Sequence, residues 1–147
     1  MRTSKEMRNL KSKMRRDMSP AIRAIADHYR AIYSEFELKE CCIVGSYVVE
    51  LIIIPKMLVV IGKREDGNER AFLSHCGFVS VVEIPNAYPS SIDGIVRSID
   101  AAGTIMNSQA RLRSALGRAN AIRGNILQRV GNCDNRDDVP TLFDGGS

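Results

Sequence analysis

The N-terminal part of the chain repeats apolar side chains at the spacing of an α-helix. In residues 1–18 a thin apolar stripe runs along an otherwise cationic segment and consists of Met7, Leu10 and Met14. Ser19-Pro20 then marks a new helix start, because Ser is a favoured N-cap and Pro fits the first turn. A second helix is predicted over residues 20–36, packing on the core through Ile22, Ile25, Tyr29, Ile32 and Phe36.

From Leu38 the pattern changes to that of strands. Tyr47–Ile54 and Met57–Lys63 are rich in Val and Ile, and Pro55 separates them because it cannot donate to a sheet ladder. Asp66-Gly67 is a strong hairpin signal, and it predicts two further strands over 71–75 and 78–84. We therefore expect three or four antiparallel strands in a meander, with both faces of the first two covered.

The helical period returns after residue 91 and continues for about 40 residues, or some 60 Å if the helix is unbroken. The apolar positions are Ile92, Ile95, Ile99, Ala102, Met106, Leu112, Leu116, Ala119, Ile122, Ile126 and Val130. Their spacing is nearer 3.5 than 3.6, which favours a coiled coil and self-association, or a helical hairpin. Gly103 and the polar run 107–109 mark where two helices would be joined.

These elements predict an α+β fold in three segments. Residues 1–18 form a basic arm, residues 19–131 form a single domain that includes the C-terminal helix or hairpin, and residues 132–147 form a flexible acidic tail. The length of 147 residues suits one such domain.

Composition adds that the core is aliphatic and the compartment reducing. Aromatic residues make up 5% of the chain and Trp is absent, so Ile, Val, Leu and Met must fill the interior. Four cysteines without a signal peptide favour reduced thiols and a cytoplasmic protein. Residues 41–62 are apolar and long enough to span a bilayer, but Glu50, Pro55 and Lys56 favour buried strands over a membrane segment.

The charge is unevenly distributed, although the net charge is only +4. Residues 1–16 carry seven Lys/Arg against one Glu, and residues 86–131 carry six Arg against two Asp. Such density favours a phosphate partner through counterion release. The predicted contacts with the nucleic-acid backbone are Arg2, Lys5, Arg8, Lys11, Lys13, Arg15 and Arg16, with a second stripe of Arg97, Arg111, Arg118 and Arg129. An acidic protein, a membrane surface or a merely solvated helix face would also explain these charges.

Motifs for metal binding, cofactors and catalysis are not recognised. Cys41-Cys42 and His75-Cys76 are adjacent pairs whose side chains diverge on a strand, so we predict no metal site and no cofactor. A phosphate-binding glycine loop, a nucleophile elbow and a zinc-protease motif are all missing, and the protein is not expected to be an enzyme.

The acidic tail contains an apolar peptide, with Val139, Leu142 and Phe143 as its predicted partner-binding residues. The segment PTLFD resembles the short Leu-Phe peptides by which bacterial replication and repair proteins bind the sliding clamp, without their opening glutamine, and its acidic setting is similar to the tails of single-strand-binding proteins. This resemblance implies a protein partner. Three alternatives stay open: the tail folds back onto the long helix, its acidic side chains screen the basic arm when no partner is bound, or it is unstructured.

Together these patterns predict a small, non-enzymatic accessory protein, encoded by a phage or mobile element, that binds nucleic-acid backbone through basic helices. The alternative is a homo-oligomeric structural or adaptor protein assembled through the C-terminal helix.

Overall fold

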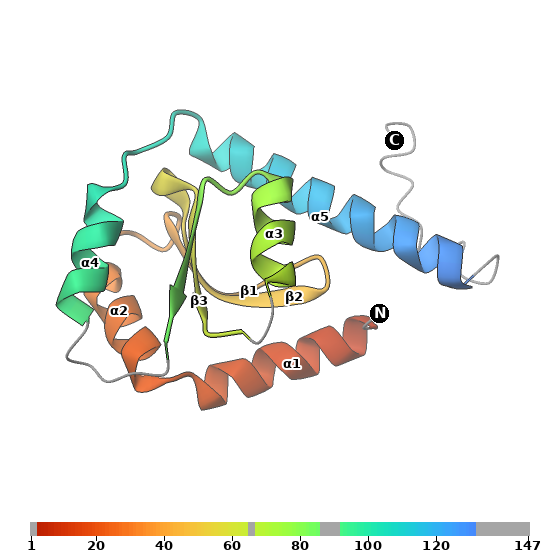
Figure 1. Ribbon diagram of the computed structural model, residues 1–147, viewed down its shortest axis with the longest axis horizontal. Helices are drawn as coiled ribbons and strands as arrows, with labels where there is room; N and C mark the ends of the chain where they lie inside the picture. Colours follow the sequence, from red (N-terminus) through yellow and green to blue (C-terminus); the bar gives the residue numbers. More distant parts are fainter. Residues whose placement is uncertain (1–2, 65–66, 86–91, 132–147) are drawn as a thin grey trace.

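The computed structural model of the chain describes residues 3–64, 67–85 and 92–131, with side chains described as far as residue 122. It is an α+β fold in which helices cover both faces of a four-stranded sheet (Figure 1). The helices are α1 Ser4–Asp17, α2 Pro20–Arg30, α3 Asn68–Cys76, α4 Ile92–Ala101 and α5 Ser108–Gly131, with a 3-10 turn η1 at Ile54–Lys56. The strands are β1 Leu38–Val44, β2 Tyr47–Ile53, β3 Leu58–Gly62 and β4 Ser80–Ile84.

The sheet is mixed, so the predicted antiparallel meander was wrong in its last step. Strands β1, β2 and β3 pair antiparallel in sequence order, but β4 pairs parallel to β3. A parallel neighbour requires a crossover, and α3 provides it where a strand over 71–75 had been predicted. Gly67 is the N-cap of α3 and does not lie in a hairpin turn between two strands.

The range of strand β1 was not predicted, although Cys41-Cys42 were expected on a strand, because its apolar pattern is irregular. Cys41 has a φ of +51° and lies opposite Glu50, between the paired steps Glu40–Leu51 and Cys42–Val49. A non-glycine residue in the left-handed region interrupts the alternation of side chains. As a result Glu40 and Cys41 both turn toward the face that carries α1 and α2.

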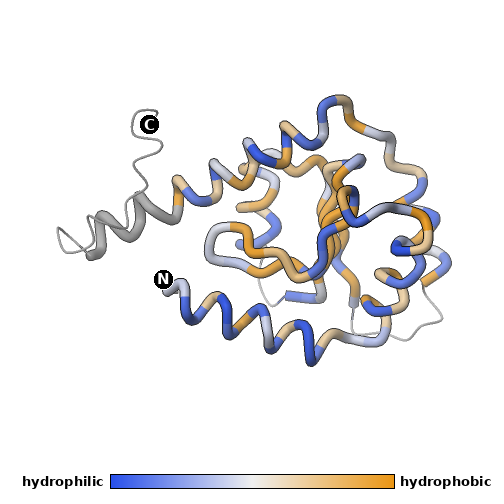
Figure 2. Tube along the Cα trace, turned by 180° about the vertical axis from the view of Figure 1, so that it is seen from behind, coloured by the Kyte–Doolittle hydropathy of each residue, from blue (hydrophilic) through white to orange (hydrophobic). Residues whose placement is uncertain are grey.

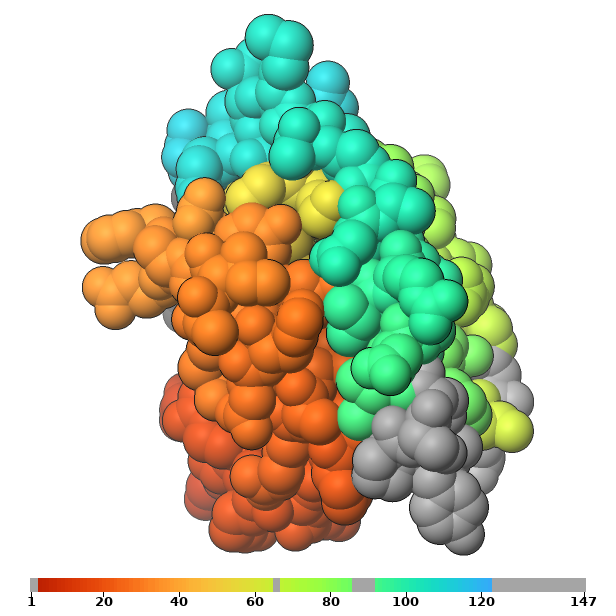
Figure 3. All heavy atoms as spheres, turned by 90° about the vertical axis from the view of Figure 1, so that its left-hand side faces the viewer, coloured from red at the N-terminus to blue at the C-terminus, as the bar shows by residue number. Residues whose placement is uncertain are grey.

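The two faces of the sheet are covered by different helices. Helices α2 and α4 pack on one face around Ile25, Leu51 and Ile99, while α3 and α5 pack on the other around Leu73 and Leu112. Figure 3 shows α2 and α4 side by side on the molecule's surface, where the Tyr29 hydroxyl donates to Asp100 at 2.8 Å. Burial, and then the Asp100 carboxylate, raise the pKa of Tyr29.

Helix α2 is shorter than its apolar pattern predicted. Ile22, Ile25 and Tyr29 are buried as expected, but the helix ends at Arg30, and Ile32 and Phe36 are 59% and 72% exposed. The chain must turn after α2 to enter edge strand β1, so the last two apolar positions leave the helical face.

The C-terminal helical pattern forms two elements, α4 and α5, on opposite faces of the sheet. The joining segment 102–107 is held against η1 by a hydrogen bond from Ile105 N to Pro55 O of 2.7 Å, and the Lys56 ammonium donates to Ala102 O. Leu112 and Ala119 are buried against the chain's own sheet. These apolar positions therefore need no second helix to cover them, and a coiled coil stays a prediction.

Candidate nucleic-acid interface

Helix α1 is a cationic helix fixed to the sheet by an apolar stripe. Met7 is 2% exposed and packs with Cys41 and Val48, and Leu10 and Met14 are half-buried beside them. Thr3 and Glu6 form a reciprocal capping box at the helix N-terminus, with bonds of 2.7 and 3.0 Å. Capping and the Met7 contact together order a segment that charge repulsion alone would disfavour.

The outward side of α1 carries the predicted phosphate contacts. Lys5, Arg8, Lys13, Arg15 and Arg16 are exposed, and Lys11 is half-buried. Figure 2 shows the strongly hydrophilic character of α1 beside the apolar sheet. Within the described side chains, ion pairs involve only Arg30 and Arg64, so none of these six cations forms an ion pair with a carboxylate of its own fold. Arg15 is the one of the six that lies near the Glu40 carboxylate, whose pKa it helps to lower.

Positive charge continues from α1 onto strand β1. Burial raises the pKa of the Cys42 thiol, and the nearby Lys11 and Lys39 oppose that rise. Burial likewise raises the pKa of Cys41, against the effect of Arg15. Lys39 was not singled out from the sequence, because only the docking of α1 onto β1 brings both Lys11 and Lys39 near the Cys42 thiol.

Two other arginines near α1 are used within the fold. The Arg23 guanidinium donates to the carbonyls of Arg15, Arg16 and Met18 and so caps the C-terminal end of α1. Arg30 donates to Glu40 at 2.7 and 2.9 Å, and this hydrogen bonding lowers the pKa of the Glu40 carboxyl. These side chains hold the helices in place, and we do not count them among the phosphate contacts.

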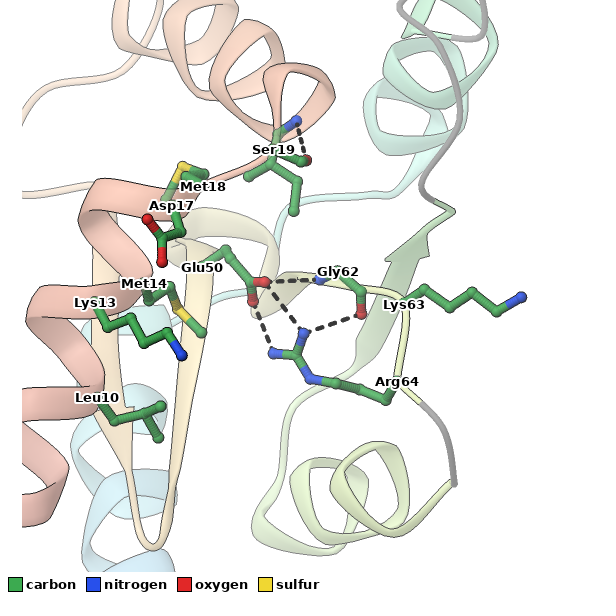
Figure 4. A pocket seen from close by; sticks show the side chains of 11 residues that line it. Leu10, Lys13, Met14, Asp17, Met18, Ser19, Glu50, Gly62, Lys63 and Arg64 are labelled. Carbon is green, nitrogen blue, oxygen red and sulfur yellow. Dashed lines mark hydrogen bonds and ion pairs between the residues drawn. The ribbon is translucent and has the colours of Figure 1, made fainter.

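A pocket of about 290 Å³ lies where α1 turns into α2 above strands β2 and β3 (Figure 4). Its wall combines apolar side chains with charged ones: Leu10, Met14, Met18, Ile22, Lys13, Asp17, Glu50, Lys63 and Arg64. Arg64 is bound on one side by Glu50 at 2.9 Å and on the other by Glu69 at 2.7 Å. Both carboxylates are buried, and although burial lowers the pKa of Arg64, the hydrogen bonds that it donates to Glu69 and Glu50 raise this pKa overall.

This buried ion triad has a structural role. It joins β2, the end of β3 and α3, and Glu50 also accepts from the Gly62 backbone at 3.0 Å. Because the Arg64 charge is already matched by two carboxylates, the pocket does not offer a free guanidinium to an anion. We therefore assign this pocket no ligand.

The second predicted set of arginines does not form one stripe. Arg97 lies on α4, whereas Arg111 and Arg118 lie on α5 across the sheet, so the predicted stripe is divided between two helices. Arg111 donates to Met106 O at 3.1 Å and Arg118 to Cys76 O at 3.0 Å. Arg2 and the side chain of Arg129 lie outside the described residues, as does the tail with Val139, Leu142 and Phe143.

The cysteine and histidine pairs are placed on different elements. Cys41 and Cys42 belong to β1, whereas His75 and Cys76 belong to the end of α3. Among the side chains that the structure describes, no group of three or more His, Cys, Asp or Glu is arranged to hold a metal ion. None of the described helices is long and apolar enough to cross a bilayer.

Comparisons with known proteins assign no relationship. A scan against protein-family models found no match, and searches of curated proteins and of solved structures found no significant match to the chain. Function therefore rests on the residues and geometry described above.

Proposed function

We propose that the protein is a non-enzymatic accessory protein that binds the phosphate backbone of nucleic acid through the outward side of α1. The observation that carries the proposal is the set of six cations on one anchored helix, none of them ion-paired in the described part of the chain. An excess of unmatched positive charge on a fixed surface attracts a polyanion through release of its counterions. The cation Lys39 on β1 extends this surface.

The contacts expected on such a helix are with phosphates and not with bases. Lys and Arg side chains on a solvent-facing helix bind phosphate oxygens, which fixes the position of a duplex without reading its sequence. Helix α1 carries no aromatic side chain, and Tyr29 on the neighbouring α2 is buried in the α2–α4 contact. Stacking of unpaired bases is therefore not part of the proposed binding mode.

The test is duplex binding measured over a salt series with two matched double variants. Arg8→Gln with Arg16→Gln removes two exposed cations from α1, and Arg70→Gln with Arg113→Gln removes two exposed cations from α3 and α5. We expect the affinity of the unmodified protein to fall steeply as the salt concentration rises. In a plot of the logarithm of the binding constant against the logarithm of the salt concentration, the α1 variant should have a slope that is shallower by roughly 2, because each lost phosphate contact removes about 0.9. The second variant keeps the slope.

Fluorescence anisotropy with a labelled duplex measures both the affinity and its dependence on salt. A flat salt response of the unmodified protein would contradict the proposal, and so would equal losses in the two double variants. Point variants are preferred to removal of residues 1–18, because deleting Met7 would expose Cys41 and Val48 and disturb the sheet.

A protein partner bound through Val139, Leu142 and Phe143 remains part of the proposal as the sequence predicts it. The proposal also keeps an intracellular location and a gene carried by a phage or mobile element. The alternative function, a homo-oligomeric adaptor, is favoured by one observation from the sequence: the apolar repeat of α5 continues at Ile126 and Val130.

A further inference from the structure

A second pocket lies on the other face of the sheet, between the end of α3 and the N-terminal half of α5. Its volume is about 420 Å³, within the range of pockets that hold small molecules. The residues that line it are Gly77, Asn107, Ala110, Arg111, Ser114 and Arg118. Among these described lining residues are two cations and two neutral hydrogen-bonding side chains, and none is acidic.

Both arginines are held in place by backbone carbonyls. Arg111 Nε donates to Met106 O at 3.1 Å, and Arg118 Nη1 donates to Cys76 O at 3.0 Å. A guanidinium has five N–H donors, so one such bond orients the group and leaves most of its donors for a ligand. Neither arginine is in an ion pair among the described side chains, in contrast to Arg64 on the opposite face.

Gly77 allows Arg118 to lie against the end of α3. The residue has a φ of +122°, which L side chains rarely adopt, and a Cβ placed there would lie 3.0 Å from Arg118 Nη1. Its amide closes α3 by donating to Leu73 O and Ser74 O. The turn that ends α3 is thus also the surface on which this guanidinium rests.

The donors of the pocket are arranged in a row along α5. Arg111, Ser114 and Arg118 follow one another at steps of three and four residues, so they share one face of the helix. A hydroxyl therefore lies between two guanidinium groups, and Asn107 adds an amide one turn earlier. Guanidinium forks and hydroxyl donors together match the several oxygens of a phosphate better than the two of a carboxylate.

We propose that this pocket is a phosphate-binding site for a phosphorylated ligand, either a free nucleotide or diphosphate, or a phosphate within a nucleic acid. The site does not depend on the proposed function of α1. Val48 packs with α1 whereas the next residue, Val49, packs on the face that carries α5, so the two basic surfaces lie on opposite sides of the sheet.

Titration of the full-length protein with pyrophosphate and with a nucleoside monophosphate tests the site, followed in amide NMR spectra. We expect saturable shifts at Gly77 and Ser114, and a dissociation constant raised roughly tenfold or more by Arg111→Gln or Arg118→Gln, each of which removes charge-assisted bonds. Arg113→Gln is the matched control, because Arg113 is exposed on the same helix, carries the same charge and does not line the pocket.

Several outcomes separate the proposal from its rivals. Equal weakening by all three variants, or equally tight binding of acetate at the same ionic strength, would show general attraction of anions and overturn the site. Absence of saturable binding by pyrophosphate, the nucleotide and a short oligonucleotide would also overturn it.

The ligand source follows from competition. If a nucleotide binds and an oligonucleotide does not displace it, the ligand is a free phosphorylated molecule. If only the oligonucleotide binds, the ligand is nucleic acid. The Arg8 and Arg16 double variant keeps pyrophosphate binding in either case, so failure of the α1 proposal and failure of this one are distinguishable. Thermal unfolding of each variant confirms that the fold is intact.

Discussion

At the scale of single residues, Gly45 allows the turn between two strands to lie close to two helices. Gly45 forms the turn between β1 and β2 with a φ of +64°, and a Cβ there would lie 2.8 Å from the Phe72 ring and 3.2 Å from Ala119 O. The turn is therefore pressed between α3 and α5. In contrast, a Cβ at Gly117 on α5 would meet no atom within 4 Å.

These two positions predict opposite responses to the same substitution. Gly45→Ala should lower the free energy of unfolding by about 1–3 kcal/mol, because the backbone conformation is strained for Ala and the methyl group overpacks the turn. Gly117→Ala should raise it by up to about 1 kcal/mol, since Ala is the better helix former. Urea denaturation of both variants measures the difference, and a neutral Gly45→Ala would contradict the tight contact with Phe72.

At the scale of elements, α1 shows how few apolar side chains hold a charged helix. Met7 is the buried residue of α1, and it reaches the sheet beside Cys41 and Val48. Isolated helices of this length are marginal in water, so most of the stability of α1 must come from this contact. The cationic surface of the proposed function depends on it.

We predict that Met7→Ala releases α1 from the sheet without unfolding the remainder. The loss of the buried side chain should cost about 2–5 kcal/mol at that site, the range found for Met→Ala in cores. Hydrogen exchange would show faster exchange of the α1 amides, while those of β3 stay protected. Met106→Ala is the control, because Met106 is 81% exposed and should change stability by less than about 0.5 kcal/mol. Unchanged protection of α1 in the Met7 variant would contradict the anchor.

Helix α3 shows why a short element was misassigned. The buried positions of α3 are Glu69, Leu73 and Cys76, at steps of four and three, and Gly77 stands just after the helix. This helical signal was present in the sequence, but it spans only nine residues and follows a hairpin-like dipeptide. Local pattern could not choose between a strand and a helix there, because the choice depended on β4 pairing parallel to β3.

At the scale of the whole molecule, the sheet separates the basic surfaces. Helix α1 lies across the sheet from α5 (Figure 1), so a single straight duplex that contacts α1 does not also contact the Arg111 and Arg118 pocket. The two sets of cations that the sequence predicted, the basic arm and the arginines of α5, therefore lie on separate surfaces. Each has its own test.

The oligomeric state is the prediction that belongs to this scale. Light scattering over a concentration series, combined with absorbance at 260 and 280 nm of protein purified without nuclease, separates the two functions. Copurified nucleic acid supports backbone binding, whereas a stable multimer free of nucleic acid supports the adaptor. A multimer would have to use surfaces other than Leu112, Ala115 and Ala119, since the chain's own sheet covers these residues.

The sequence by itself determined the features that depend on neighbours along the chain. The Ser19 cap with Pro20 predicted the start of α2, the Val- and Ile-rich runs predicted β2 and β3, and Pro55 predicted the break between them. The cationic character of α1 was likewise evident, because charge density is a property of composition. These signals act within a few residues and do not need the rest of the fold.

The tertiary structure alone decided which distant segments meet. The parallel pairing of β4, the kink at Cys41 and the separation of α4 from α5 all depend on packing across the sheet. The bracing of Arg118 by Cys76 O likewise joins residues 42 positions apart. The physical reason is that a periodic pattern specifies that a face is buried but not which surface buries it, so the partner of each face, and the pocket between α3 and α5, emerged only once the chain had folded.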